Sequence, residues 1–367
     1  MAHNRFGTRF TFTTWGESHG PSIGVVIDGC PAGIAITTSE INLALKKRAP
    51  GQHKHTSPRK EADQARILSG VYQGKTTGAP ISLVIENTDV KSEAYVPLKD
   101  IYRPGHANYT YLQKYGRMDQ RGGGRASARE TAARVAAGAV AQALLNHHGI
   151  SIQTYMHQIG TVRCTPHHFS AISEAHAPLN LSDEALTARM WNEVNEAQQA
   201  GDAIGGVVGG IIQHVPCGLG EPIYEKIEAK LACAMMSIPA SKGFEVGMGF
   251  DAAAMRGSEH NDSMQAKNGR SRFSSNHAGG ILGGISTGEP ITFRVAFKPT
   301  SSIKRPQSST NTSNENVTYT LDERSRHDPC VAIRAIPVVE AMTQCVIADC
   351  LLLNQTAMLN PVDPDAS

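Results

Sequence analysis

The sequence RGGGRASARETAARVAAGA, residues 121–139, combines a glycine run, four arginines and the start of a helix. The glycines at 122–124 allow backbone N–H groups to turn toward a ligand at close range. Ser127 and Glu130 have the spacing of a capping box, so we expect the helix to begin at Ser127, with its positive end toward the glycines. The small apolar residues that follow favour a helix packed tightly against a sheet. The stretch therefore predicts an anion-binding loop at the tip of a core helix.

The arginines of this stretch have two interpretations. Forked guanidinium donors suit phosphate and carboxylate ligands, whereas an ordinary capped helix with a surface Glu130–Arg134 pair would explain the same residues. The charge of the wider region favours the first interpretation. Residues 103–134 contain six arginines and one lysine against two acidic residues, an excess of five positive charges. A small, multiply charged anion would suit that density.

Composition excludes several classes of protein. The chain has 367 residues, 40% of them hydrophobic, with a net charge of +2 and a pI near 8.1. It has no apolar run of about 20 residues and no apolar N-terminal segment, so we expect no membrane span. A dedicated nucleic-acid domain would have a pI above about 9. Seven cysteines without a C-x-x-C pair predict reduced thiols in a cytoplasmic protein, and no residue cluster predicts a metal site.

Local patterns place several elements. Residues 8–14 (TRFTFTT) and 22–29 (SIGVVIDG) predict two strands, joined by GESHG at 16–20. Thr37 and Glu40 form the capping box of a predicted helix that turns Ile41 and Leu45 inward and ends at Arg48. Further along, Ser182 is expected to cap a helix that Gly201 stops.

The second half contains two long polar segments and a final helix. We expect a mobile lid over residues 256–278 and a disordered excursion over 304–318. Residues 331–336 (VAIRAI) predict a strand, and a buried helix is expected to start near Pro337.

Two internal sequence similarities predict a duplicated architecture. Residues 205–211 (GGVVGGI) resemble 279–285 (GGILGGI), and 25–33 resemble 211–220. We infer two similar β–α halves, at about 1–200 and 201–360, within a single domain over 1–360 followed by a tail at 361–367. The glycines in these strands would allow either close packing or the approach of a flat ligand ring.

Two histidines occupy settings that suit chemistry. His19 lies between glycines at a strand end and could act as an acid near pH 7, although a hydrogen-bonded structural histidine fits the same setting. His106 follows a Pro-Gly turn, which holds its ring on a stiff loop and favours a chemical role.

Six motifs together resemble the chorismate synthase family. They are GESHG (16–20), RPGHA (103–107), RGGGRASARET (121–131), SNHAGGILGGIS (275–286), KPTSS (298–302) and RHDPCVAIRAIP (326–337). The resemblance runs from about residue 5 to about 355. It implies an α+β fold, a β-α-β sandwich with internal pseudo-two-fold duplication of β–α units, in a cytoplasmic homotetramer. It also implies a lyase of the shikimate pathway, which serves aromatic amino acid biosynthesis.

That resemblance implies a reaction and a set of roles. The family converts 5-enolpyruvylshikimate 3-phosphate to chorismate and phosphate by an anti-1,4-elimination that requires reduced FMN. His19 would protonate the departing phosphate, His106 would balance the charge of the reduced flavin, and Asp328 would work beside the flavin N5. The substrate's anionic groups would be bound by Arg48, Arg129, Arg134 and Arg334. FMN would be held by Arg125, Ala126, Ser127, Pro239, Ala240, Gly283, Lys298, Pro299, Thr300, Ser301, Ser302 and Arg326. Whether NADPH reduces the flavin is left open, with Arg48 and Lys54 as its candidate ligands.

The chain departs from the commoner family pattern at four positions. Ala126, Lys54 and Pro239 stand where Ser, Arg and Asn are frequent. Asn108 stands where an aspartate is usual after RPGHA, so one negative charge that would raise the pKa of His106 is missing.

Two other classes of protein remain as alternatives. A flavin-dependent oxidoreductase of a small anionic substrate would consume NAD(P)H with each turnover. A nucleic-acid-binding protein would show steep salt dependence and no need for flavin.

Overall fold

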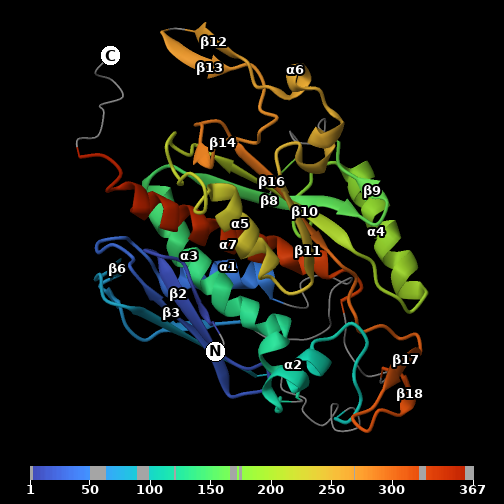
Figure 1. Cartoon of the computed structure of the whole chain (residues 1–367). Coiled ribbons are helices and arrows are strands. Elements are labelled where there is room, and N and C mark those ends of the chain that lie inside the picture. The colour runs from blue at the N-terminus through green and yellow to red at the C-terminus, as the bar shows by residue number, and fades with distance from the viewer. Residues whose placement is uncertain are drawn as a thin grey trace.

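A computed structural model describes residues 3–49, 63–88, 99–119, 121–165, 172, 176–267, 269–321 and 328–359. It contains two five-stranded antiparallel sheets with long helices between them (Figure 1). Lys54, Arg326 and the tail at 361–367 lie outside the described residues.

The first sheet comes from the N-terminal quarter of the chain. Its order is β1 (Arg5–Phe6), β2 (Thr11–Gly16), β3 (Ser22–Asp28), β7 (Ile81–Glu86) and β4 (Ala65–Ile67). Alternation turns Ile23, Val25 and Ile27 of β3 into the core, where each is fully buried. Both strands predicted in this part of the chain are thereby confirmed. A short hairpin, β5 (Val71–Tyr72) and β6 (Lys75–Thr76), precedes β7.

The second sheet has the order β11 (Ser241–Val246), β16 (Ile291–Phe297), β10 (Gly206–Gln213), β8 (Ser151–Ile159) and β9 (Val162–Arg163). A Cβ atom at Gly209 would overlap the ring of Tyr155, and one at Gly210 would overlap the ring of Phe293. The glycines of β10 therefore make room for the protein's own aromatic rings. Of the two explanations for these glycines, close packing and the approach of a flat ligand ring, the contacts of β10 support close packing. Because β8 and β9 pair into this sheet, the division between the sheets does not coincide with the predicted boundary near residue 200.

Two core helices join the sheets. Helix α3 (Thr131–His147) packs on β3 and β7, α7 (Val331–Asn354) packs on β8 and β10, and the two helices pack on each other. At their contact a Cβ on Gly138 would lie 2.6 Å from the Ala341 Cα, so the small residues permit close approach. The prediction that the helix after the glycine run, α3, packs against a sheet is confirmed by its contacts with β3 and β7. Helix α7 is also long and apolar enough to cross a membrane, but 83% of its apolar window is buried inside the protein.

The smaller helices follow local sequence signals. Helix α1 (Thr38–Arg48) has the predicted capping box at Thr37 and Glu40, with Ile41 and Leu45 fully buried. Helix α5 (Ile227–Met236) lies against α7. Helix α4 (Glu184–Gln199) is capped by Asp183 rather than the predicted Ser182, because the Asp183 carboxylate accepts the Leu186 N–H at 2.9 Å. Helix α2 (Asn108–Tyr115) follows the RPGHA motif.

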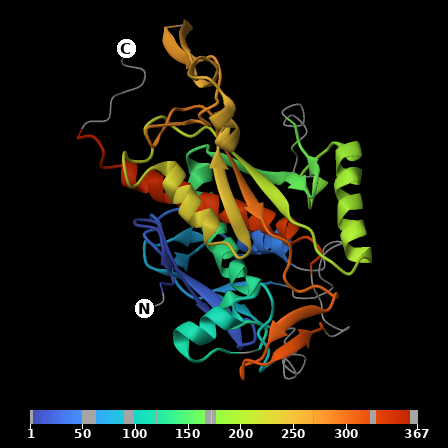
Figure 2. The ribbon, with the colours of Figure 1, turned by 45° about the vertical axis from the view of Figure 1, so that its right-hand side comes forward.

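Two expectations about the second half are corrected, and the mobile lid stays a prediction. Residues 331–336 begin helix α7 instead of forming a strand, and Pro337 lies inside that helix, because burial of the VAIRAI side chains outweighs the hydrogen bond that proline cannot donate. The segment expected to be disordered, 304–318, contains the hairpin β17 (Gln307–Thr310) and β18 (Asn316–Tyr319). The expected lid contains α6 (Gly257–His260) and a hairpin, β12 (Met264–Lys267) and β13 (Arg270–Phe273), that projects from the body of the protein (Figures 1 and 2).

Candidate functional site

The glycine run seats both candidate histidines. Gly122, Gly123 and Gly124 have φ values of +63°, +92° and +53°, a conformation that favours glycine. A Cβ at Gly122 would overlap the imidazole of His19, and one at Gly123 would lie 3.1 Å from the His106 Cε1. One loop thus brings together two histidines that are 87 positions apart in the sequence.

The helix after this loop begins later than predicted. Two 3₁₀ turns, η2 (Gly124–Ala126) and η3 (Ala128–Glu130), precede the start of α3 at Thr131. The Ser127 hydroxyl accepts the Arg129 N–H at 3.3 Å. The Glu130 carboxylate pairs with Arg134 at 2.8 Å, so the predicted capping box does not form there. The Glu130–Arg134 pair itself is partly buried and is not a surface decoration.

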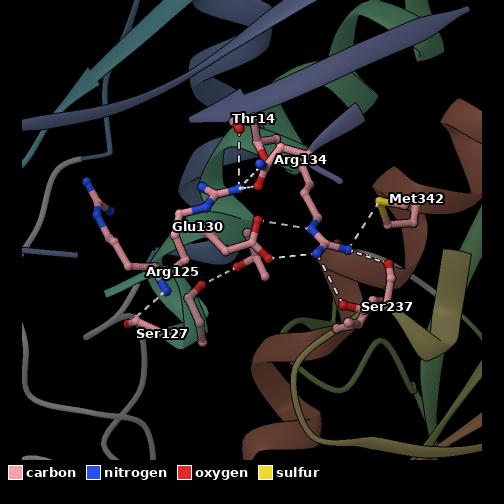
Figure 3. A network of polar contacts seen from close by, with 12 residues as sticks. Thr14, Arg125, Ser127, Glu130, Arg134, Ser237 and Met342 are labelled. Carbon is pink, nitrogen blue, oxygen red and sulfur yellow. Dashed lines mark hydrogen bonds and ion pairs between the residues drawn. The ribbon is translucent and has the colours of Figure 1, made fainter. Parts of the chain in front are cut away.

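Arg125 and Arg134 join the start of α3 to both halves of the protein (Figure 3). Arg125 donates to the Thr14 hydroxyl at 2.8 Å and to the Gly16 carbonyl at 3.1 Å, on strand β2. Arg134 donates to the Ser237 hydroxyl at 2.6 Å, at the end of α5. Because the Arg125 guanidinium is engaged by the protein, a ligand beside it would meet the backbone of residues 125–127.

His19 lies in a tight turn that ends strand β2. Its side chain is buried, with the residue 8% exposed, and its Nδ1 lies 3.1 Å from the Ser18 hydroxyl. The Asn87 amide donates to the carbonyls of Glu17 at 3.0 Å and Gly20 at 2.8 Å, so it holds both ends of the turn. No sequence motif had indicated a role for Asn87.

His106 lies among cations. The Arg103 Nη2 is within 3.2 Å of both ring nitrogens, and the Lys298 Nζ donates at 2.8 Å to the Gly105 carbonyl. Burial, then Arg103 and Lys298, lower the pKa of His106 to about 4, so its ring is neutral at pH 7. Asn108 accepts the Arg103 N–H at 3.1 Å and donates to the Ile101 carbonyl at 2.9 Å. Asn108 therefore keeps the loop hydrogen-bonded, and among the described residues only cations, Arg103 and Lys298, shift the pKa of the histidine through their charge.

The KPTSS loop connects His106 with Asp328. Ser301 donates to the Gly105 carbonyl at 2.8 Å, and Thr300 donates to the Asp328 carbonyl at 2.7 Å. The Asp328 carboxylate accepts from the Arg334 Nη1 at 2.8 Å, while the buried Nε of Arg334 has no partner among the described residues. Unpartnered buried donors are rare and indicate a missing ligand or water.

A buried charge cluster lies within electrostatic range of Arg334. One carboxylate, Asp63, pairs with Arg48 at 2.6 Å and with the Nη1 of Arg129, and all three side chains are at most 3% exposed. Burial alone would raise the pKa of Asp63, but the two guanidinium groups outweigh it and lower the pKa. Burial lowers the pKa of Arg48 to about 10, with Arg334 and Arg129 adding repulsion. The cluster therefore holds a surplus positive charge.

Both arginines of the cluster are engaged by protein groups. Arg48 also donates to Thr131 at 3.1 Å and to the Ala128 carbonyl at 3.1 Å. Arg129 also donates to Asn87 at 2.9 Å and to the Glu86 carbonyl at 3.2 Å. The NADPH role expected of Arg48 gains no support from these contacts.

The remaining residues predicted to bind FMN lie in two different places. Ala240, with φ +70°, accepts the Lys298 N–H at 3.0 Å, which places the Pro239–Ala240 turn against the KPTSS loop. Gly283 is exposed in the hairpin β14 (Ile281–Leu282) and β15 (Ile285–Ser286). That hairpin bonds to the start of α5, at the end opposite Ser237, so this chain does not bring Gly283 to the histidines.

A cavity adjoins the glycine run. Its volume is about 760 Å³, within the usual range of about 300–1,000 Å³ for small-molecule sites. It is lined by Gly123, Gly124 and Arg125 and by the aromatic residues Trp15 and Tyr115, and the candidate histidines lie outside its lining, so it adjoins the proposed site without enclosing it.

Comparisons with known proteins agree with one another. A family model described as chorismate synthase matches residues 10–352. The chain is 53% identical to chorismate synthase of Protochlamydia amoebophila, over 98% of this chain and 100% of that protein. It is 51% identical to chorismate synthase of Novosphingobium aromaticivorans, over 97% and 99%. A crystal structure of chorismate synthase superposes with a TM-score of 0.73 at 32% identity, covering 95% of this chain and 93% of that one.

Proposed function

The chain belongs to the chorismate synthase family, and from that membership we propose how its own residues carry out the family's reaction. It is a carbon–oxygen lyase of the shikimate pathway that eliminates phosphate from 5-enolpyruvylshikimate 3-phosphate to give chorismate, and it depends on reduced FMN. The observation that carries the proposed site is the glycine run, which packs against His19 and His106 together.

The described residues fit a bound flavin. Because residues 122–124 are glycines, a ligand can approach their backbone closely. The side chains of Arg103, Lys298 and Ser301 provide hydrogen-bond donors beside His106. When bound, reduced FMN supplies transient electron donation to a substrate whose C6 hydrogen is too weakly acidic for a side-chain base. FMN is proposed to contact Arg125, Ala126 and Ser127 through their backbone. The turn at Pro239–Ala240 and the loop at 298–302 are proposed to line the same site.

Positive charge on the protein is proposed to orient the substrate. The substrate carries two carboxylates and a phosphate, about four negative charges at neutral pH. Arg334, whose buried Nε has no hydrogen-bond partner among the described residues, is the proposed direct ligand, whereas Arg134 is engaged by Glu130 and Ser237 and is proposed to contribute charge. Arg48 and Arg129 contribute charge from the buried cluster behind them.

Proton transfer is assigned to two side chains, His19 and Asp328, and charge balance to the surroundings of His106. His19 is proposed to protonate the phosphate as it leaves, because its buried ring lies at the glycine run, where an anion would bind. Asp328 is proposed to assist the removal of the C6 proton, with Arg334 fixing its carboxylate. His106 is neutral without ligand, and a bound anion would raise its pKa. Arg103 and Lys298 therefore share the task of balancing the flavin's charge.

Assembly and location are further proposals. The exposed position of Gly283 supports a role in the flavin site of a second copy, which agrees with the homotetramer expected of the family. A cytoplasmic location is supported by seven free thiols, of which burial raises the pKa of Cys30 to about 11 and of Cys164 to about 12. A duplicated origin is supported by two hairpin-plus-strand units, β5 to β7 and β14 to β16, spaced alike along the chain.

An anaerobic assay tests the site. Phosphate release from 5-enolpyruvylshikimate 3-phosphate is measured with a small amount of dithionite-reduced FMN, for wild type, His106→Ala and His148→Ala. His148 is an exposed histidine at the end of α3 and serves as the control. We expect many turnovers per flavin, no net flavin oxidation, and a rate loss of about 10² or more for His106→Ala alone. An unimpaired His106→Ala would remove this residue from the mechanism, and one turnover per oxidised flavin would indicate an oxidoreductase.

A further inference from the structure

The contacts of Arg129 are those of a positioning group. Three edges of its guanidinium bind protein acceptors: the Asp63 carboxylate, the Asn87 side-chain oxygen at 2.9 Å and the Glu86 carbonyl at 3.2 Å. The side chain is 2% exposed. Three hydrogen bonds fix the orientation of the planar guanidinium, and this in turn restricts the orientation of the groups that accept from it.

Asn87 connects Arg129 to the turn that contains His19. Its side-chain oxygen accepts from the Arg129 Nε, so its NH₂ group must face the other way. That NH₂ group donates to the carbonyls of Glu17 and Gly20, and the Asn87 backbone N–H donates to the Pro21 carbonyl at 3.0 Å. The arginine therefore decides which way the amide points, and the amide closes the turn that carries His19.

Asp63 completes the arrangement at its other end. Its backbone φ of +36° is unusual for a residue that is not glycine, and such conformations persist where the surroundings enforce them, often at functional sites. The same carboxylate binds Arg48, which donates to Thr131 at the first turn of α3. The turn of His19 is thereby tied to the start of the core helix.

We propose that Asp63, Arg129 and Asn87 form a positioning relay that holds His19 in place for protonation of the leaving phosphate. The inference rests on the function proposed for His19. It gives Arg129 a positioning role through its contacts with Asp63 and Asn87, and it adds two residues that no sequence motif indicated. Since misplacement of a reacting group by about 1 Å can cost about 10²-fold in rate, breaking the relay should lower kcat much more than it changes KM.

Asn87→Asp breaks one side of the relay. A carboxylate still accepts from Arg129, but it cannot donate to the two carbonyls of the turn and repels them. Thr88→Asp is the matched control, because Thr88 is the next residue, is exposed, and receives the same added charge. Asp63→Asn weakens the other end, and Glu86→Gln, which alters an exposed ion pair with Arg66, is its control.

Two readouts decide the proposal. In the anaerobic assay, Asn87→Asp should lower kcat about 10- to 100-fold with KM changed less than about threefold. In a His19→Ala background the same substitution should lower kcat less than about twofold, because its effect acts through His19. Hydrogen exchange of the peptide spanning residues 16–21, which contains the Gly20 N–H bonded to Glu17, should speed at least about tenfold in Asn87→Asp relative to Thr88→Asp.

The exchange measurement separates this inference from the proposed function. If the wild-type protein released no phosphate with reduced FMN, the proposed function would fail, and the exchange result would still decide whether Asn87 orders the turn. Unchanged exchange in Asn87→Asp would overturn the relay. An equal loss of kcat with and without His19 would overturn it as well, because the effect would then not pass through that histidine.

Discussion

The substitution Gly122→Ala probes the contact between the glycine run and His19. At φ +63° an alanine costs about 1–2 kcal/mol in backbone strain, and its Cβ would overlap the His19 ring and crowd the Ser18 hydroxyl at 2.8 Å. Gly124→Ala carries a similar backbone cost at φ +53°, but the nearest atoms to its Cβ are 3.6 Å away. The two variants therefore differ mainly in what the added methyl group does to the histidine.

The expected results follow from the freedom of the His19 side chain. An imidazole can rotate away from the methyl group, so the two variants should lose similar unfolding free energy, about 1–2 kcal/mol each by urea titration. The displaced ring should lower kcat for phosphate release about 10²-fold in Gly122→Ala relative to Gly124→Ala. Equal kcat values in the two variants would refute the claim that His19 packs against Gly122 and acts from that position.

Three further predictions concern stability. Asp349→Ala should lower the free energy of unfolding by about 3 kcal/mol or more, because the Asp349 carboxylate accepts three backbone N–H groups from residues 8–10, at 2.6–3.0 Å; a loss below about 1 kcal/mol in urea titration would contradict this. Burial lowers the pKa of His157 to about 4, so the unfolded state binds the extra proton and this residue should account for about 2 kcal/mol of the stability lost between pH 7.5 and pH 5; because the pKa of His106 is also lowered to about 4 and adds a loss of its own, His157→Gln should lose about 2 kcal/mol less than wild type over this range, and an equal loss would contradict the burial effect. Gly138→Ala should cost about 1–2 kcal/mol despite alanine's better helix propensity, since the methyl group would press on Ala341; an unchanged or raised melting temperature would count against the tight packing of α3 on α7.

Sequence reasoning succeeded where the signal is local. The capping box at Thr37 and the inward side chains Ile41 and Leu45 follow from contacts within a few residues of one another. The strand pattern of 22–29 likewise needs only alternation to place its buried face. These features were predictable because no distant partner decides them.

The missed features depend on partners far away in the sequence. Asp63 meets Arg129 across 66 positions and Asn87 meets it across 42, so neither pairing leaves a local motif. The start of α7 was placed too late because the proline signal at Pro337 is local, whereas burial of the preceding turn against the rest of the core is not. The neutral state of His106 was also not predictable from the sequence, because it depends on burial and on where the fold places Arg103 and Lys298.

One site, assembled on the glycine run, is proposed to hold the flavin and the substrate between His19, His106 and Asp328. A crystal structure with FMN and 5-enolpyruvylshikimate 3-phosphate tests it most directly. The account predicts the isoalloxazine ring beside His106 and Asp328, with the substrate phosphate within hydrogen-bond distance of His19. A flavin bound elsewhere, or a phosphate remote from His19, would contradict it.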